Sequence, residues 1–285
     1  MRLLTVPNWS FGRDRALERI CRDRLLKEKV RVHYLQGDVD HNRTVMGFSG
    51  QPNALLGALL ALADLILPRI DLNHHVGVHP RIGALDVCPI VVPPGEDPSE
   101  AGIAAQMLVQ ELGQALAETW DLPVFMYEKS ERGRHEADLP SLRRGGFGGM
   151  LDRDLKPDYG PPRCHPRLGV VVVGVRDFLI AMNVNLSTPS PRTAMALAKK
   201  ARSLRQEGDP RFLGVRALGF SLPSRGLSQV SFNLTLPDIT SADAIVEWVQ
   251  GQKPGFHSTE VVGVVRRADL LRLTRFNLAP EAVVD

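Results

Sequence analysis

The sequence predicts an α+β protein (an α/β sandwich) with two halves, each a mixed β-sheet with helices packed on one face. At 285 residues, the chain is long enough for two domains of ordinary size. Its 44% hydrophobic and 24% charged residues are typical of a globular protein with a sizeable core. The apolar runs follow the order β-α-β-β-α-β over the first ninety residues, and approximately β-β-α-β-β-α-β in the second half. No repeat in the sequence itself relates the halves.

In the first ninety residues, the polar turn "PNWSFGRD" precedes a basic amphipathic helix with Ala16, Ile20 and Leu25 on its inner face. The nearly all-apolar run "NALLGALLALADLIL" predicts a second helix, capped by Asn53 and ending before Pro68. Alternating or continuous apolar runs predict strands over residues 3–6, 30–35, 44–50 and 84–92.

A long helix is predicted to begin at Pro98, because Asp97 supplies a capping side chain and Glu100 follows three residues later. Its expected inner stripe comprises Ala104, Met107, Leu108, Leu112, Ala115 and Leu116. A strand is expected over residues 122–128. The segment 129–167 is rich in Gly, Pro and charge, which indicates a ligand-lining loop with one short helix.

The second half begins with two β-rich runs, over residues 168–175 and 178–186. A helix is expected over residues 191–204, after the turn signals "STPSP", and another from Ser241. Further strands are predicted over residues 214–222, 228–236 and 259–265.

Composition restricts the functional classes. A formal net charge of +3 tolerates an anionic ligand but does not require nucleic acid. The start, "MRLLTVPNWS", is too short an apolar run for a secretory signal, and no stretch approaches the roughly 20 uninterrupted apolar residues of a membrane helix. Three widely spaced cysteines predict neither disulfides nor a zinc site. We therefore expect a cytoplasmic protein that acts without nucleic acid, membrane or metal.

The segment "HHVGVHPR", residues 74–81, concentrates titratable side chains. His75 and His79 have the spacing of a helical zinc pair, but Pro80 discourages a helix at this point and no Glu of an HExxH motif is present. A histidine at the mouth of a strand can instead act as a general base, because its reference pKa is about 6.5. Histidines that merely form hydrogen bonds in a turn are the remaining alternative.

The segment "DVDHNRT", residues 38–44, superficially resembles a calcium loop. Arg43 stands where that loop needs Gly, and Ser49 where it needs Glu, so calcium is disfavoured. Either this is a solvated turn between strands, or Asp38, Asp40 and Arg43 present carboxylates and a guanidinium to one polar ligand.

Two other motifs favour ordinary structural interpretations. "RRGGFGG", residues 143–149, resembles the Arg-Gly boxes of RNA-binding proteins, but it occurs once, so a flexible loop is favoured. "GVVVVGV" lacks the glycine pattern of a dinucleotide-binding loop.

Several blocks together resemble the glutamate formimidoyltransferases: "VPNWSFGRD", "DHNRTVMGFSGQP", "HVGVHPRIGALDVCP", "PDYGP" followed by "GVRDFLIAMNVNL", "SQVSFNLT" and "STEVVGVV". The resemblance implies transfer of the formimidoyl group from N-formimidoyl-L-glutamate to N5 of tetrahydrofolate, in histidine degradation, with tetrahydrofolate as co-substrate and no metal. It also implies two α/β formiminotransferase-type subdomains, residues 1–168 and 169–285, with a ligand tunnel between them. Because the chain stops at Asp285, a stand-alone transferase without a cyclodeaminase domain is expected.

Residue by residue, the resemblance assigns His79 as the catalytic histidine. It assigns folate binding to Gly160, Pro161, Pro162, Arg163, Cys164, His165, Pro166, Arg167, Leu168 and Gly169. The chain departs from many relatives at Phe11 and Gly146, and from some at Val78, where those relatives carry Glu; these departures bear on substrate preference.

The implied reaction assigns further roles. Neutral His79 would take a proton from N5 and return one to the departing glutamate nitrogen, while Asp38 or Asp40 stabilises the amidinium or orients the imidazole. Arginines suit the carboxylates of both substrates. The candidates for substrate binding are Arg43, Arg81, Arg176, Asn183 and Asn185, with Arg163, Arg167, Gln229 and Asn233 as further polar contacts.

Two alternatives stay open. One is another folate-dependent one-carbon transferase, with formylglutamate or another formimidoyl amino acid as donor. The other is a non-catalytic folate- or RNA-binding module, although 6% aromatic residues are few for stacking on bases. A homodimer is also left open.

Overall fold

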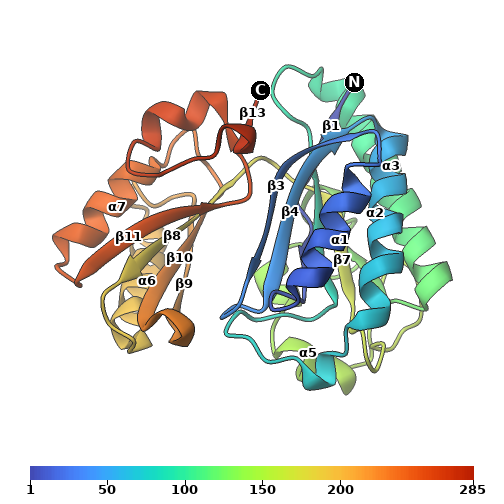
Figure 1. Cartoon of the computed structure of the whole chain (residues 1–285), viewed down its shortest axis with the longest axis horizontal. Helices are drawn as coiled ribbons and strands as arrows, with labels where there is room; N and C mark the ends of the chain where they lie inside the picture. Colours follow the sequence, from blue (N-terminus) through green and yellow to red (C-terminus); the bar gives the residue numbers. More distant parts are fainter. The chain divides into compact units, whose positions relative to one another are not determined.

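A computed structural model describes residues 1–285 of the chain (Figure 1). The chain divides into two compact units, Met1–Arg176 (unit 1) and Asp177–Asp285 (unit 2). The division falls later than the expected boundary between residues 168 and 169. The reason is that strand β7 (Val171–Val175) pairs in parallel with β5 (Leu85–Val91) and β6 (Val124–Met126), and therefore completes the first sheet.

Unit 1 contains one mixed sheet. Besides β5, β6 and β7, its strands are β1 (Leu3–Thr5), β2 (Asn8–Trp9), β3 (Val30–Asp38) and β4 (Arg43–Gly50). The central strands β1 and β2 pair antiparallel with β4 on one side and β5 on the other, and β3 flanks β4. The parallel trio β5-β7-β6 forms the other end of the sheet.

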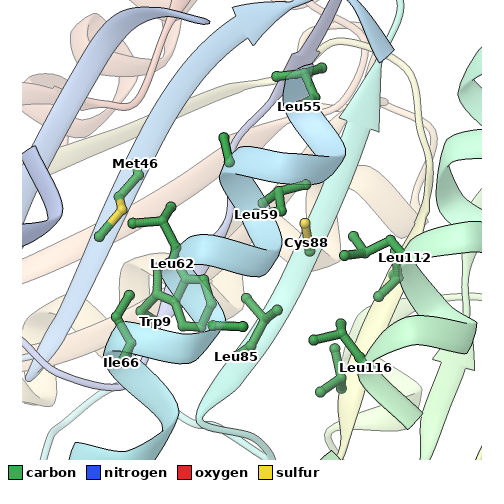
Figure 2. Packing of buried hydrophobic residues seen from close by; sticks show 14 of the residues in the cluster. Trp9, Met46, Leu55, Leu59, Leu62, Ile66, Leu85, Cys88, Leu112 and Leu116 are labelled. Atoms are coloured by element: carbon green, nitrogen blue, oxygen red, sulfur yellow. The ribbon is translucent and has the colours of Figure 1, made fainter. Parts of the chain in front are cut away.

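Three helices lie on one face of this sheet: α1 (Arg15–Leu25), α2 (Pro52–Ile66) and α3 (Pro98–Trp120) (Figure 1). The apolar side chains between the helices and the sheet form the main core of unit 1, in which α2 occupies the middle. Figure 2 shows Leu62 of α2 close to Trp9 and Met46, and Leu59 close to Cys88 of β5. Burial of this surface is the main driving force for folding of the unit.

Three details of the helices differ from the sequence predictions. Leu25 of α1 is buried as predicted, but Ile20 is 41% exposed and Ala16 is also exposed, because the helix buries Leu17 and Cys21 in their place. Helix α2 begins at Pro52 with Gln51 as its N-cap rather than Asn53, because proline at the first helical position needs no N–H partner and has its φ preset.

In α3 the expected stripe was wrong at Met107, which is 57% exposed. The buried stripe is Ala101, Ala105, Leu108, Val109, Leu112, Gly113 and Leu116. Asp97 caps this helix as predicted, accepting hydrogen bonds from the backbone N–H groups of Ser99 and Glu100.

The segment Pro52–Arg69 is the one helical stretch long and apolar enough to cross a membrane by length and composition, with a mean hydropathy of 1.3. Core helices of soluble proteins pass the same test. Its inner side chains, among them Leu55, Leu59 and Leu62, are packed in the core of unit 1.

The segment 129–167 was expected to hold one short helix, and it holds two, α4 (Leu139–Leu142) and α5 (Gly146–Leu151). The remaining helical segments of the chain are short 3₁₀ helices: Leu67–Arg69, Leu72–His74, Glu128–Ser130, Pro223–Arg225, Arg267–Arg272 and Pro280–Ala282.

Unit 2 is a four-stranded antiparallel sheet with helices on one face. Its elements are β8 (Ile180–Leu186), α6 (Pro191–Gln206), β9 (Val215–Leu222), β10 (Leu227–Leu234), α7 (Ala242–Gly251) and β11 (Phe256–Val262). The strand order is β11-β8-β10-β9, and a separate pair joins β12 (Val265–Arg266) to β13 (Val283–Val284) in parallel. Side chains such as Phe212 and Phe232 form its own core.

The two units share one topology. Unit 2 follows the chain order β-α-β-β-α-β, and across its sheet the strands lie in the order second, third, first, fourth. Unit 1 has the same chain order in β1, α1, β3, β4, α2 and β5. Across its sheet, these four strands lie in the equivalent order β3-β4-β1-β5. This arrangement is the split βαβ, or ferredoxin-like, motif. The predicted order of elements in the second half therefore contained one strand too many, since residues 171–175 belong to unit 1.

Candidate functional site

The candidate site is built from two loops of unit 1, the turn between β3 and β4 and the segment that leads into β5. Arg81 joins them. Its Nη1 donates to the carbonyl of Asn42 at 3.0 Å, and its Nη2 donates to the carbonyls of His41 at 2.6 Å and His79 at 2.9 Å. Arg81, a predicted carboxylate ligand, thus holds the loops together, and its predicted contact with substrate stays a prediction.

Gly77 permits this close approach. A Cβ at this position would lie 2.3 Å from the carbonyl oxygen of His41, closer than any side chain tolerates. The Nδ2 of Asn42 donates to the carbonyl of Val76 at 3.1 Å, and the N–H of Val78 donates to the carbonyl of Asp40 at 3.0 Å. The backbone around His79 is therefore fixed from both sides.

His79 is half-buried and its tautomer follows from its neighbours. Its Nδ1 lies 2.8 Å from the carbonyl of Pro80. Because a carbonyl only accepts hydrogen bonds, Nδ1 carries the proton of the neutral ring and Nε2 is the basic nitrogen. The ring centroid lies 5.7 Å from that of His41, which is buried.

The surroundings keep His79 uncharged. Burial lowers its pKa well below the usual 6.5, and the cationic groups of Arg43, Arg143, His41 and Arg81 lower it further. Burial also lowers the pKa of nearby His75, to about 4. At neutral pH the ring of His79 is therefore uncharged, which is the form that a general base requires.

Asp38 and Asp40, the predicted carboxylate partners, lie in the same turn. The Oδ1 of Asp38 accepts a hydrogen bond from the N–H of His41 at 2.7 Å, which shapes the turn. Asp40 is buried and its carbonyl is bonded to the second loop, as described above. Their catalytic roles stay predictions.

Three arginines, Arg43, Arg81 and Arg143, lie near one another at the amino end of β5. Asp86 of β5 is buried, accepts from the N–H of Ile82 at 2.7 Å and forms an ion pair with Arg143. Burial lowers the pKa of Arg43, and the positive charge of Arg143 lowers it further. The site around His79 is therefore cationic, as binding of an anionic substrate requires.

Sequence reasoning missed His41, Asp86 and Arg143. The run "RRGGFGG" was interpreted as a flexible loop, and that interpretation was wrong: it forms the turn after α4 and the first four residues of α5. A Cβ on Gly146 would lie 3.6 Å from the carbonyl of Arg81. A polar Asp86 inside the apolar strand "ALDVCPIVV" was the available signal, because a buried carboxylate needs a partner.

The predicted folate-binding segment, residues 160–169, runs along the amino ends of the parallel strands. The N–H groups of Arg167 and Leu168 donate to the Nδ1 of His165, and the Nη1 of Arg167 donates to the carbonyls of Pro68 and Ile70. Gly169 has a φ of +75° and pairs with Gly83 close to the His79 loop. The segment thus adjoins the site, and its folate binding stays a prediction.

Two of the predicted ligand-binding arginines lie elsewhere. Arg163 is exposed, 3.9 Å from Asp121 at the end of α3. The N–H of Arg176 donates to the carbonyl of Ile90, at the carboxyl end of β5, whereas His79 precedes the amino end. Along a strand at about 3.3 Å per residue, the two ends are roughly 20 Å apart. The structure therefore does not bring Arg176 to the His79 cluster.

Asn183 and Asn185 lie in unit 2, on the face of the sheet opposite the helices, within a buried polar network. The Nδ2 of Asn183 donates to Glu260 at 3.1 Å, and the Nε2 of Gln229 donates to Asn185 at 2.9 Å and Glu260 at 2.7 Å. Asn233, on the same strand as Gln229, is exposed. The network presents amides and one carboxylate together.

No group of three or more His, Cys, Asp or Glu side chains is placed to hold a metal ion. All three cysteines are free and buried, and burial raises the pKa of Cys21 and Cys88 to about 12.

A half-buried histidine whose pKa is strongly lowered by burial and by adjacent arginines marks a candidate site for acid–base chemistry on an anionic ligand. Residues 2–176 match the family model described as the N-terminal subdomain of the formiminotransferase domain, which coincides with unit 1. The chain belongs to the formiminotransferase family.

Among its relatives, the glutamate formimidoyltransferase of Thermoplasma acidophilum is 30% identical over 96% of this chain and 91% of that protein. The enzyme of that name from Streptococcus pyogenes is 29% identical over 97% of this chain and 93% of the relative. The formimidoyltransferase-cyclodeaminase of Gallus gallus is 31% identical over 97% of the chain, which spans 52% of that longer protein.

The chain thus spans about half the length of the formimidoyltransferase-cyclodeaminases that it matches. Among solved structures, a microcompartment protein from Desulfitobacterium hafniense aligns over 92% of this chain and 94% of the other, with a TM-score of 0.22 and 11% identity.

Proposed function

We propose that the chain transfers a formimidoyl group from N-formimidoyl-L-glutamate to N5 of tetrahydrofolate. The observation that carries the proposal is His79: its backbone is fixed by two interlocked loops, its ring is kept neutral and arginines surround it. The relatives of this chain from Thermoplasma acidophilum and Streptococcus pyogenes are named glutamate formimidoyltransferase, which supports the proposal.

The proposed reaction begins when N5 of tetrahydrofolate attacks the amidine carbon of the donor. The N5–carbon bond forms, and Nε2 of His79 takes the proton that N5 loses. His79 then gives a proton to the glutamate nitrogen, the bond from that nitrogen to the amidine carbon breaks, and glutamate departs. The products are 5-formimidoyl-tetrahydrofolate and glutamate, and His79 returns to its neutral form.

Folate recognition completes the proposal. Residues 160–169 adjoin the His79 loop through the pairing of Gly83 with Gly169, which supports a folate contact there. Asn183, Asn185 and Gln229 belong to one hydrogen-bonded network with Glu260 in unit 2, and their contact with a pterin stays a prediction. The ligand tunnel expected between the subdomains stays a prediction.

The test is turnover of the purified protein with tetrahydrofolate and formimidoylglutamate, followed by formation of 5-formimidoyl-tetrahydrofolate. A His79→Ala variant is expected to retain its melting temperature and tetrahydrofolate affinity, and to lose on the order of 10²–10⁴-fold in kcat. Near-normal turnover in this variant would remove His79 from the mechanism.

The identity of the donor is tested in the same assay. Formylglutamate and formimidoyl derivatives of other amino acids are supplied at equal concentration, and kcat/KM is compared. We expect formimidoylglutamate to be the best substrate. A higher kcat/KM for any other donor would assign the chain to a different folate-dependent one-carbon transferase.

A cytoplasmic setting stays a prediction, and so does the homodimer. The assembly state is tested by light scattering coupled to size-exclusion chromatography, which distinguishes the 31.4 kDa monomer from a dimer.

A further inference from the structure

The ion pair of Asp86 with Arg143 carries an inference about how the donor is held. Asp86 is buried on β5, and both of its oxygens are engaged, by the N–H of Ile82 and by Arg143. Arg143 comes from the turn between α4 and α5, far along the chain from β5. The pair therefore fixes a guanidinium beside the His79 loop from a segment that is otherwise distant in sequence.

One donor of that guanidinium has no partner. The Nε of Arg143 is buried, and no hydrogen bond within the chain engages it. A buried polar group without a hydrogen bond destabilises the structure that contains it, and the cost is greater for a charged group. The unsatisfied N–H thus marks a position where a bound acceptor would be stabilised.

Arg43 supplies a second available cation. Its side chain is half-buried, and no hydrogen bond within the chain engages its guanidinium, in contrast to Arg81, which is held by three carbonyls. Burial and the charge of Arg143 both disfavour its protonated form, so an anion placed near the two arginines relieves both unfavourable effects.

The chemistry of the occupant is that of a carboxylate, whose two oxygens match the planar fork of a guanidinium. Both proposed substrates carry carboxylates. In the donor, the α-carboxylate is attached to the carbon that bears the departing glutamate nitrogen, so it lies two bonds from an atom of the bond that breaks. In folate, the glutamyl carboxylates lie at the far end of the molecule from N5. A cationic site next to the base therefore suits the donor.

We propose that Arg143 and Arg43 bind the α-carboxylate of the formimidoyl donor beside His79, and that Asp86 is the positioning residue for Arg143. This inference rests on the proposed function. It assigns a substrate contact to Arg143 in the "RRGG" turn. Asp86 does not contact the substrate and acts only by holding Arg143 in place.

The first experiment compares Arg143→Gln with the wild type in steady-state kinetics. We expect KM for formimidoylglutamate to rise roughly tenfold or more, because a charge-assisted hydrogen-bond pair is lost, while KM for tetrahydrofolate stays within about twofold. Arg144→Gln is the matched control, since Arg144 is the exposed neighbour in the same turn, and it should leave both constants unchanged. A rise in KM for tetrahydrofolate alone would overturn the assignment in favour of the folate tail.

The second experiment removes the carboxylate instead of the arginine. N-formimidoyl-4-aminobutyrate lacks the α-carboxylate, so the wild type should discriminate against it, and Arg143→Gln should lose most of that discrimination. Equal discrimination in the two proteins would overturn the proposal. Arg143→Lys, which keeps a charge for Asp86 but lacks Nε, gives the same readout where the neutral variant does not fold.

Asp86→Asn tests the positioning role. It should raise KM for the donor but not for tetrahydrofolate, and the double variant with Arg143→Gln should be no worse than Arg143→Gln alone. Additive effects would show that Asp86 acts independently of Arg143 and would overturn the positioning role.

Calorimetric binding of formimidoylglutamate without tetrahydrofolate separates this inference from the proposed function. Tight binding to the wild type and weak binding to Arg143→Gln supports the carboxylate site even if no transfer to folate occurs, an outcome that would contradict only the proposed function. Equal binding to both proteins would overturn the carboxylate site whether or not transfer occurs.

Discussion

His79 illustrates how single residues set the chemistry of the site. Burial and the adjacent cations lower its pKa well below 6.5, so the basic form persists as the pH falls. We expect kcat/KM for the donor to stay level from pH 8 down through 6.5 and to decline only at lower pH. An acid limb near pH 6.5 or above would contradict this environment. In Arg43→Gln, loss of a neighbouring charge should move the limb to higher pH.

Gly77 is a second residue that sets the geometry of the site, because its position has no room for a side chain. Because a Cβ there would lie 2.3 Å from the carbonyl of His41, Gly77→Ala must push the two loops apart. We expect a loss of roughly 1–3 kcal/mol in the free energy of unfolding, as for other overpacked sites, and a large fall in kcat.

The matched control for Gly77 is Gly57→Ala in helix α2, where nothing lies within 4 Å of the added methyl group. The better helix propensity of alanine should leave stability unchanged or raise it by up to about 1 kcal/mol. Chemical denaturation of both variants measures the difference, and similar behaviour of the two would contradict the close approach.

His135 gives unit 1 a pH-dependent contribution of its own. Its Nε2 lies 2.7 Å from Asp158, and although burial opposes protonation, this hydrogen bond raises the pKa of His135 above 6.5. A raised folded-state pKa stabilises the fold fully below the unfolded value near 6.5 and loses effect as the pH rises through the folded pKa.

We therefore expect His135→Gln to reduce the free energy of unfolding more at pH 5.5 than at pH 8.5. Differences between variant and wild type cancel the contributions of the other histidines. A larger loss at pH 8.5 would show that the neutral ring is the stabilising form.

At the scale of the elements, the N-cap of α3 is a separable contribution to stability. Asp97 accepts two backbone hydrogen bonds at the start of this helix. Asp97→Ala should therefore cost about 1 kcal/mol in the free energy of unfolding. Gln51 caps α2 without a side-chain hydrogen bond, so Gln51→Ala should change stability little. Equal effects from the two variants would mean that the Asp97 bonds contribute nothing.

Most elements were predictable from local sequence, whereas the arrangement around the site was not. The cap at Asp97 and the apolar run of α2 are local signals, and both predict their helices. Which side chains of α1 and α3 face inward depends on the sheet they meet, so Ile20 and Met107 were placed wrongly.

The site was predictable only in part for a similar reason. His79 lies in a distinctive local segment, and the sequence indicated it. The ion pair of Asp86 with Arg143 joins residues far apart in the chain, which no local pattern records. Parallel pairing of β7 with β5 places Arg176 at the carboxyl ends of these strands, away from His79, and its ligand binding stays a prediction.

At the scale of the whole chain, each unit has its own core, so we expect unit 2 to fold alone. The fragment 177–285 contains a complete four-stranded sheet, two helices and a contiguous cluster that includes Ile180, Phe212 and Phe232. Expressed separately, it should show a cooperative thermal transition and dispersed amide resonances. A fragment without either property would show that its core requires the first unit.

The repeated strand order has a consequence for how this architecture can diversify. Two copies of one scaffold permit a division of labour, because one copy can specialise in chemistry while its twin specialises in recognition. Here the histidine-bearing loop interrupts only the first copy, and the row of amides lines only the second. Because the proposed donor site of Arg43 and Arg143 lies in the first copy, donor specificity can change there without rebuilding the second.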